Sequence, residues 1–273
     1  MAHLRVPFRP LAAIAALSAG LALLTGCGDG SGASGTDRSS GEAGASSGPV
    51  VVATSTWEAA LAKAAGARDV RYIVPASIRH APDYDLKPSD LTAVAGADYV
   101  LYASFEPWAG KIKEAAGSHG KLVQVNLDNT PAAARAEVTR LGKEFGTERA
   151  AAKWNSTFSA AWASLAKQVK ATWPHGKAPA VASQKFTTWA AELAGAKVVG
   201  TYGPEAVTPA QLSALSAKKP AFVLDNENMS TGTVLPGSGA EQLNVVNYPG
   251  KDLDLLAVYR KAAGQMEKAF SGA

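Results

Sequence analysis

The stretch from Tyr72 to Trp108, YIVPASIRHAPDYDLKPSDLTAVAGADYVLYASFEPW, decides the fold of this chain. It begins as a short apolar strand, passes through a loop rich in Pro and Asp, and continues as a helix from Pro88, with Ser89 as the expected N-cap. A second apolar strand runs from Tyr99 to Ala103, and Glu106-Pro107-Trp108 opens another helix. Strands that alternate with helices in this way predict a parallel sheet.

Polar side chains follow the first strand of this stretch. Ligands of parallel α/β sheets bind beyond the carboxyl ends of the strands. His80, Asp83 and Asp85 come after the first strand, so we expect them at this binding edge. His119 and His175 instead precede strands, which predicts that they are surface residues far from His80.

The N-terminal segment has the pattern of an export signal. Arg5 and Arg9 precede an apolar run of fourteen residues, 11–24, which is too short to span a bilayer and is typical of a signal peptide. Leu24-Thr25-Gly26-Cys27 resembles a bacterial lipobox. Residues 1–26 are therefore predicted to be a lipoprotein signal peptide. Lipidation of Cys27 would then anchor the protein on the extracytoplasmic face of the cell membrane; the alternative is an ordinary secretory signal with a chance Cys.

Residues 27–49 are mostly Gly, Ser and Ala and are expected to form a disordered tether. The 22 residues after Cys27 have a reach of about 25 Å. Cys27 is the only Cys, so the chain has neither a disulfide nor a Cys nucleophile. Without Arg5 and Arg9, 25 of the 27 basic residues face 23 acidic ones. This net charge of +2 argues against nucleic-acid binding.

Residues 50–146 are predicted to form an N-terminal βα lobe. Thr130-Pro131 is the expected N-cap and first position of its last helix, which runs to about Phe145. The predicted strands are Val50–Ala53, Val70–Val74, Tyr99–Ala103 and Lys121–Val125.

Residues 147–173 give the longest helical pattern in the chain. Large apolar residues recur there at spacings of 4, 4, 3, 4 and 4, which predicts one buried stripe that packs in the core. A helix of this length would be about 40 Å long. The stripe is Trp154, Phe158, Trp162, Leu165, Val169 and Trp173.

Residues 174–273 repeat the alternation of strands and helices and are predicted to form a C-terminal βα lobe. Residues 230–239 are rich in Gly and Pro and are expected to be a loop. The predicted strands are 180–183, 197–200, 221–224 and 243–246, and the predicted helices are 186–194, from Thr208-Pro209 onward, and 253–270. The fold class is therefore α/β, with two lobes of parallel sheets joined by one long helix and a ligand cleft between the lobes.

Three motifs carry a resemblance to a known family. Pro88-Ser89-Asp90-Leu91, Ala97-Asp98 and Glu106-Pro107-Trp108 occur in the order and spacing of the zinc/manganese solute-binding lipoproteins of bacterial ABC importers. The resemblance implies capture of Zn²⁺ or Mn²⁺ as the transported ligand and delivery to ABC permease and ATPase subunits. It also implies a binding protein that is a monomer and not an enzyme.

The ligand residues of the family are largely missing from this sequence. Of its three His and one carboxylate only a displaced His80 remains, and Gln124, Gln184 and Asn247 stand in the other places. Amide oxygens are poor zinc ligands because they are neutral. They are well suited to hydrogen-bond a polar organic ligand in a cleft.

Two kinds of site therefore remain open. A rebuilt metal site would use His80, Asp83 and Asp225, and the match of the scaffold favours it. An organic solute would instead meet Gln124, Gln184, Asn247, Asp85 and Glu227 as cleft residues. A structural surface lipoprotein without a small ligand is the third possibility. The chain has no nucleophile elbow, no His-Glu-x-x-His and no phosphate-binding Gly motif, so no enzyme is predicted.

Overall fold

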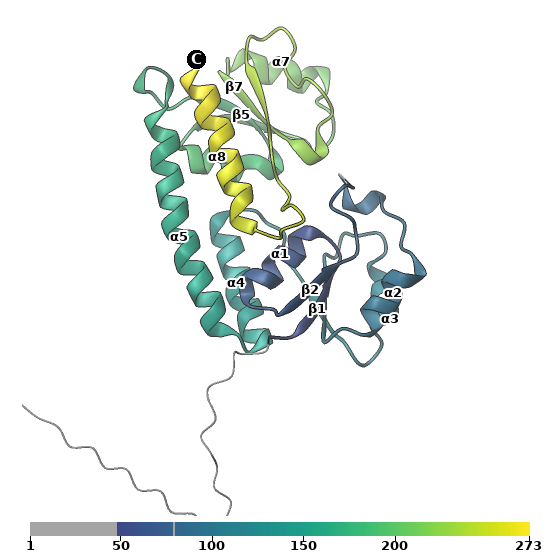
Figure 1. Ribbon diagram of the computed structural model, residues 1–273. Coiled ribbons are helices and arrows are strands. Elements are labelled where there is room, and N and C mark those ends of the chain that lie inside the picture. The colour runs from purple at the N-terminus through teal and green to yellow at the C-terminus, as the bar shows by residue number, and fades with distance from the viewer. Residues whose placement is uncertain (1–47, 79) are drawn as a thin grey trace, which may run out of the picture. The chain divides into compact units, whose positions relative to one another are not determined.

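The computed structural model describes residues 48–78 and 80–273, which belong to one compact unit, Ala43–Ala273 (Figure 1). The predicted signal peptide, the lipidation of Cys27 and almost all of the predicted tether lie outside the described residues. Within the described part of the chain, no helix combines the length and the apolar character that crossing a bilayer requires.

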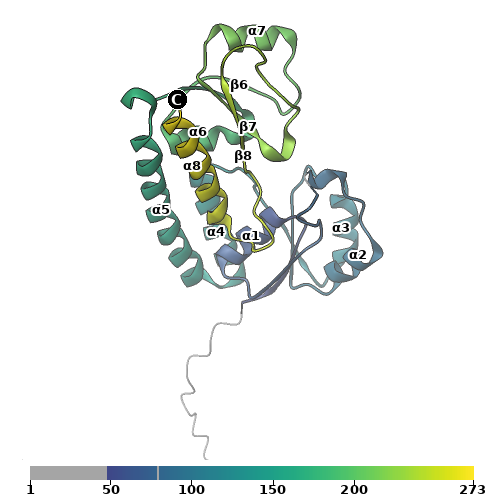
Figure 2. The ribbon, with the colours of Figure 1, turned by 45° about the horizontal axis from the view of Figure 1, so that its top comes forward.

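The N-terminal lobe is built on a parallel sheet of four strands in the order β2-β1-β3-β4. Residues of β1 alternate between two cores: Val51 and Ala53 face α1 and α4, whereas Val52 faces α2 and α3. Figure 2 shows these helix pairs on opposite sides of the sheet. The elements are β1 (Val50–Ala53), α1 (Thr56–Ala65), β2 (Asp69–Tyr72), α2 (Pro88–Ala95), β3 (Tyr99–Tyr102), α3 (Ala109–Ala116), β4 (Lys121–Gln124) and α4 (Pro131–Phe145).

The C-terminal lobe repeats this topology. Its four strands are also parallel, and their order β6-β5-β7-β8 matches that of the first sheet. The elements are β5 (Ala180–Gln184), α6 (Thr188–Ala194), β6 (Lys197–Tyr202), α7 (Pro209–Ala217), β7 (Phe222–Asn226), β8 (Glu241–Val245) and α8 (Leu255–Ser271). Short 3-10 helices are Ala81–Asp83, Pro174–Gly176, Lys185–Thr187 and Glu227–Met229. The predicted fold class, two parallel βα lobes joined by a long helix, is confirmed.

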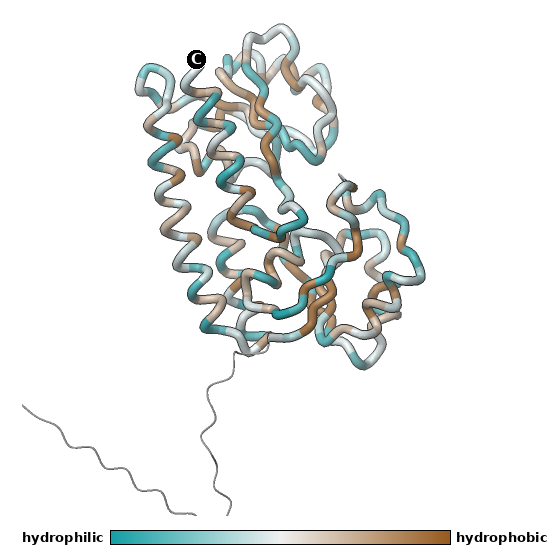
Figure 3. Tube along the Cα trace, in the orientation of Figure 1, coloured by the Kyte–Doolittle hydropathy of each residue, from teal (hydrophilic) through white to brown (hydrophobic). Residues whose placement is uncertain are grey.

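The long helix α5 (Glu148–Ala171) joins the lobes, because it packs against α1 and α4 of the N-terminal lobe and against α6 and α8 of the C-terminal lobe. Hydrophobic and hydrophilic positions alternate along α5 and α8 in Figure 3, as expected for helices with one buried face. Phe158 and Val169 of the predicted stripe are fully buried, whereas Trp154 and Trp162 are half-buried.

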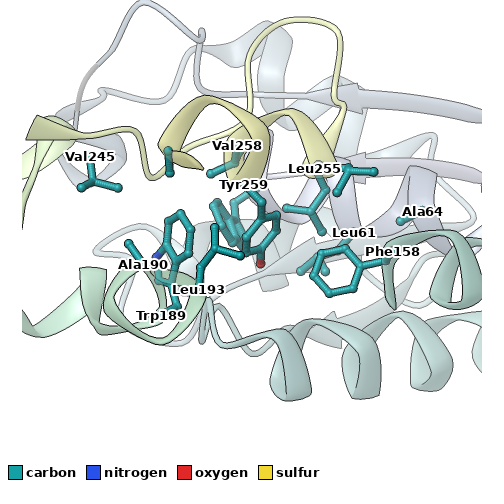
Figure 4. Packing of buried hydrophobic residues seen from close by; sticks show 14 of the residues in the cluster. Leu61, Ala64, Phe158, Trp189, Ala190, Leu193, Val245, Leu255, Val258 and Tyr259 are labelled. Carbon is teal, nitrogen blue, oxygen red and sulfur yellow. The ribbon is translucent and has the colours of Figure 1, made fainter. Parts of the chain in front are cut away.

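The core between the lobes is centred on Tyr259 of α8. Its ring meets Phe158 edge-on at 5.0 Å between centroids and Trp189 of α6 at 4.9 Å, as Figure 4 shows. Trp162 completes the group at 5.7 Å. Edge-to-face pairs of this kind add about 0.5–1.5 kcal/mol each to the area that they bury. This group of four aromatic rings therefore connects α5 with α6 and α8.

Several predicted boundaries are wrong by one to three residues. The N-cap of α2 is Lys87 and not Ser89, because the Asp90 carboxylate accepts from the Lys87 backbone N–H at 2.8 Å. Helix α3 begins after Trp108 and not at Glu106. In the C-terminal lobe, the strand pairing extends β5 by one residue and β7 by two residues beyond their predicted ends.

Candidate functional site

A cavity of about 390 Å³ lies between the two lobes. In the N-terminal lobe its lining residues follow the ends of all four strands: Trp57 after β1, His80 and Pro82 after β2, Phe105 after β3, and Leu127 and Asn129 after β4. In the C-terminal lobe they are Phe186 after β5, Pro204 after β6, Met229 after β7, and Asn247 and Tyr248 after β8. The cavity thus occupies the binding edge of both parallel sheets, and the predicted cleft between the lobes is confirmed.

The walls of this cavity are mainly apolar and aromatic. Phe105 is 64 % exposed and Phe186 is 42 % exposed, and these two rings come from opposite lobes. Behind them, Trp57 and Tyr248 meet edge-on with ring centroids 6.0 Å apart. An apolar wall with a few polar groups is typical of sites for small organic molecules.

Two buried amides connect the lobes at the cavity. The Asn129 amide donates to the Asn247 side-chain oxygen at 2.6 Å, and the Trp189 indole N–H donates to the same oxygen at 3.0 Å. The Asn129 backbone carbonyl accepts from the Tyr259 hydroxyl at 3.2 Å. Asn247, a predicted cleft residue, therefore lines the cavity while its carbonyl oxygen holds the two lobes together.

His80 and Asp83 form a pair at the rim of the cavity. His80 is the N-cap of the 3-10 helix Ala81–Asp83 and Asp83 is its last residue, and His80 Nδ1 lies 3.0 Å from Asp83 Oδ1. The Asp83 side chain is 72 % exposed, so only His80 reaches the cavity lining. The pair supplies at most two ligands for a metal ion.

The structure does not bring Asp225, the third predicted metal ligand, to this pair. Asp225 is the fourth residue of β7 and not a loop residue, and it is buried at 2 % exposure. Its carboxylate accepts from the Tyr202 hydroxyl at 2.8 Å. Burial, and after it the charge of Asp225, raise the pKa of Tyr202, so this hydroxyl stays a donor. Among the described residues, no group of three or more His, Cys, Asp or Glu is placed to hold a metal ion.

The other predicted cleft residues lie outside the lining of this cavity. Gln184 is buried and accepts from the Phe186 backbone N–H at 2.6 Å, so it fixes the turn that presents Phe186. Gln124 is exposed and lines a separate hollow beside Arg140. Glu227 lines a smaller hollow on the other side of Tyr248, and Asp85 is exposed to solvent.

No protein-family model and no curated protein sequence matches the chain. Several solved structures, however, match the chain in fold. The SBP FpvC from Pseudomonas aeruginosa in complex with Mn²⁺ matches with a TM-score of 0.60 and 14 % identity over 81 % of this chain and 96 % of that one. A periplasmic metal-binding protein from Candidatus Liberibacter asiaticus matches with a TM-score of 0.59 and 16 % identity, covering 81 % and 99 %. The laminin-binding protein Lbp of Streptococcus pyogenes matches with a TM-score of 0.57 and 14 % identity, covering 80 % and 98 %.

The chain has the fold of the metal-binding solute-binding proteins of ABC importers. The match covers nearly the whole length of each of these proteins, so both lobes and the connecting helix share the fold. The likeness in sequence is low, and the chemistry of the cleft must therefore be taken from the residues of this chain.

Five residues that line the cavity between the lobes had no role in the sequence analysis: Trp57, Phe105, Asn129, Phe186 and Tyr248. One signal could have found two of them. Phe105 and Phe186 each stand two or three residues after a strand, next to a polar neighbour, Ser104 and Lys185 respectively. An aromatic residue in a loop at the binding edge has no sheet or helix face to pack on and is a candidate for contact with a ligand.

A buried pair of carboxyl groups lies near Tyr248 in the N-terminal lobe. Burial, and after it the charge of Glu58, raise the pKa of Glu106 to about 8, although its carboxylate accepts from the Ala103 backbone N–H at 2.9 Å. Burial also raises the pKa of Glu58, which accepts from the Ser55 backbone N–H at 3.1 Å and from the Ser55 hydroxyl. The pKa of Tyr248 is raised to about 12, first by burial and then by the charges of Glu58 and Glu106. At neutral pH Glu106 is therefore mostly protonated and carries little charge.

Proposed function

We propose that this protein is the substrate-binding component of an ABC importer, anchored by lipid on Cys27 to the extracytoplasmic face of the cell membrane. The observation that carries the proposal is the cavity between the lobes, to which each of the eight strands contributes a residue from its carboxyl end. The likeness in fold to solute-binding proteins supports it. The role is binding and delivery to a permease with its ATPase, without catalysis, and the protein works as a monomer.

The chemistry of the cavity favours an organic cargo over a bare metal ion. Structural and transport sites for zinc need three or four imidazole, thiolate or carboxylate ligands. Among the described residues, the cavity lining offers one imidazole, His80, and no carboxylate. A bare cation in this mainly apolar lining would lose its hydration without compensation.

A transition metal, zinc or manganese, is the second candidate. The specific observation in its favour is His80, which lines the cavity and is paired with Asp83. One similar structure, the SBP FpvC, contains Mn²⁺ or Ni²⁺ in separate crystals. For this chain the remaining ligands would have to be amide oxygens or water, which predicts weak binding.

Cross-linking in intact cells tests the proposed role. Mass spectrometry of the cross-linked products should recover a membrane permease and its ATPase, and the Cys27→Ala variant should lose them because it is no longer held at the membrane. Recovery of cell-wall or matrix proteins alone would contradict the transport role and favour a structural surface lipoprotein.

A further inference from the structure

Two phenylalanine rings on opposite lobes are exposed at the cavity. Phe105 and Phe186 are the two aromatic residues among the large hydrophobic side chains that are exposed in the described part of the chain. Burying a Phe side chain contributes about 1.5–3 kcal/mol, so two exposed rings at one site leave a stabilisation that a ligand can realise. Both rings line the cavity of about 390 Å³ and also an adjoining hollow of about 430 Å³, so they stand close to each other where the lobes face.

Each ring is held in place by its own lobe. The backbone N–H of Phe186 donates to the buried side chain of Gln184, which fixes the turn after β5. Phe105 lies in the turn that Glu106 closes by accepting from the Ala103 N–H. Buried polar side chains thus anchor both turns, and the Lys185 ammonium lies over the Phe186 ring, 5.8 Å from its centroid. A rigid turn that presents an aromatic ring lowers the entropic cost of binding.

The floor of the cavity adds further aromatic surface. Trp57, at 2 % exposure, and Tyr248 meet edge-on at 6.0 Å between ring centroids, and Leu127 and Met229 fill the side walls. Aromatic ligands gain from offset-stacked or edge-on contacts with such rings beyond the area that they bury. The thioether of Met229 also suits contact with an aromatic ring.

The charge of the lining limits the cargo further. Within the described residues, the cavity is lined by no Asp, Glu, Lys or Arg. A permanently charged solute would therefore lose hydration without a partner, whereas a neutral one would not. The polar groups are the His80 ring, the two linked amides Asn129 and Asn247, and the Tyr248 hydroxyl, enough to orient one or two polar atoms.

We propose that this cavity is an aromatic clamp, in which Phe105 of one lobe and Phe186 of the other hold a neutral, planar aromatic small molecule above the floor of Trp57 and Tyr248. The inference rests on the proposed function, because it names the class of cargo that the importer would carry. The volume of the cavity, about 390 Å³, falls in the range of pockets for drug-sized molecules. Since each lobe supplies one ring, the bound molecule contacts both lobes at once.

A matched pair of probes tests the clamp: naphthalene-2-carboxamide, which is flat and aromatic, and decahydronaphthalene-2-carboxamide, which has the same skeleton but no π-system. Titration calorimetry is done on the mature lipid-anchored protein in detergent micelles. The Phe105→Ala/Phe186→Ala protein in the same micelles gives the background from partitioning of the probe. The aromatic probe should bind with one-to-one stoichiometry and about 3- to 10-fold more tightly than the saturated probe.

The single variants assign the effect to the rings. Phe105→Leu and Phe186→Leu keep an apolar side chain but remove the ring, so each should reduce the preference for the aromatic probe about 3-fold or more. Leu122→Ala changes another exposed apolar residue that is outside the cavity lining, and it should leave the affinity for both probes unchanged. Because all three side chains are exposed, the melting temperatures should stay close to that of the native protein.

Equal affinity for the two probes, or an unchanged preference in both Leu variants, would overturn the clamp. If the aromatic probe does not bind but cross-linking still recovers a permease, the clamp is wrong and the transport role stands. If no permease is recovered and the probe binds as expected, the transport role fails while the aromatic site remains.

Discussion

The two lobes have the same strand order but bury different polar groups at the carboxyl ends of their strands. The N-terminal lobe buries two interacting carboxyl groups, Glu58 and Glu106, and burial raises the pKa of Glu106 to about 8. A third buried carboxylate of this lobe, Glu137, pairs with Arg140. The C-terminal lobe buries one carboxylate, Asp225, against the Tyr202 hydroxyl, and uses the amides of Gln184 and Asn226 to accept from nearby backbone N–H groups.

This difference shows how one topology can be stabilised by two kinds of polar chemistry. In both lobes several polar side chains at the strand ends form hydrogen bonds with backbone N–H groups or side chains of the protein itself. Most residues that line the cavity are apolar or aromatic, Phe105 and Tyr248 among them. A fold that is also found in metal-binding proteins therefore presents a mainly apolar and aromatic cavity in this chain.

The largest expected effect concerns the carboxyl pair of the N-terminal lobe. The folded-state pKa of Glu106, about 8, lies above its ordinary value of 4.5, so the folded state binds the proton more tightly than the unfolded state. Stability from this group is therefore complete below pH 4.5 and is lost as the pH rises through 8, by up to about 5 kcal/mol. Urea unfolding at pH 5, 6.5 and 8 should show this decline.

Glu106→Gln should remove most of that decline and leave the share that comes from Glu58. Glu114→Gln, at an exposed position of α3, is the matched control and should keep the full pH dependence. A native protein that is as stable at pH 8 as at pH 5 would mean that the carboxyl pair is not buried as described.

The next effect concerns the link between the lobes. Asn247→Ala removes the oxygen that accepts from both Asn129 and Trp189, and it leaves two buried donors without a partner. The free energy of unfolding should fall by about 2–4 kcal/mol, since each orphaned donor costs about 1–3 kcal/mol. Asn247→Asp keeps an acceptor at this place and should lose much less. Equal losses in the two variants, measured by urea unfolding, would contradict this role for the oxygen.

A smaller effect is expected for the carboxylate of the C-terminal lobe. Tyr202→Phe removes the hydroxyl that donates to Asp225 and keeps the ring that packs on Leu215 and Val223. The loss should be about 1.5–3 kcal/mol, the usual range for a hydrogen bond to a charged group. Tyr72→Phe, on the outer strand β2 of the N-terminal sheet, keeps the ring that packs against the core and should change stability by less than about 0.5 kcal/mol. If Tyr202→Phe lowers the free energy of unfolding by less than about 0.5 kcal/mol, the hydrogen bond from the Tyr202 hydroxyl to Asp225 does not stabilise the fold.

The smallest expected effect is that of added metal. Zinc bound with a micromolar dissociation constant would stabilise the folded protein by about 2.7 kcal/mol at a hundredfold excess. The single imidazole of the lining predicts a far smaller change, below about 0.5 kcal/mol, for Zn²⁺ and Mn²⁺ alike. A large rise in melting temperature that disappears in His80→Ala would restore the metal site.

The fold could be predicted from the sequence because its signals are local. The run Val50–Ala53, the Thr130-Pro131 helix start and the stripe around Phe158 all appear in the structure at the expected places. The site could not be predicted as well, because it depends on strand ends to within one residue. Pairing with β8 draws Asp225 into β7, where its side chain turns into the lobe. Pairing with β6 likewise makes Gln184 the last residue of β5, where its side chain is buried.

The aromatic lining was harder still to foresee. The sequence around Phe105 marks it as an aromatic residue in a loop after a strand, but it does not show whether the ring packs in a core or faces the cleft. Its neighbour Trp108 is 7 % exposed, whereas Phe105 is 64 % exposed, although only three positions separate them. That difference depends on the turn closed by Glu106 and therefore on the folded lobe.

Native mass spectrometry of the protein released from its own membrane tests most directly whether the aromatic cavity holds the cargo. An organic adduct at one molecule per chain is expected, and it should be lost from the Phe105→Ala/Phe186→Ala protein and kept by His80→Ala. A zinc or manganese adduct that survives in the double variant and is lost in His80→Ala would contradict an organic cargo and return the site to metal capture.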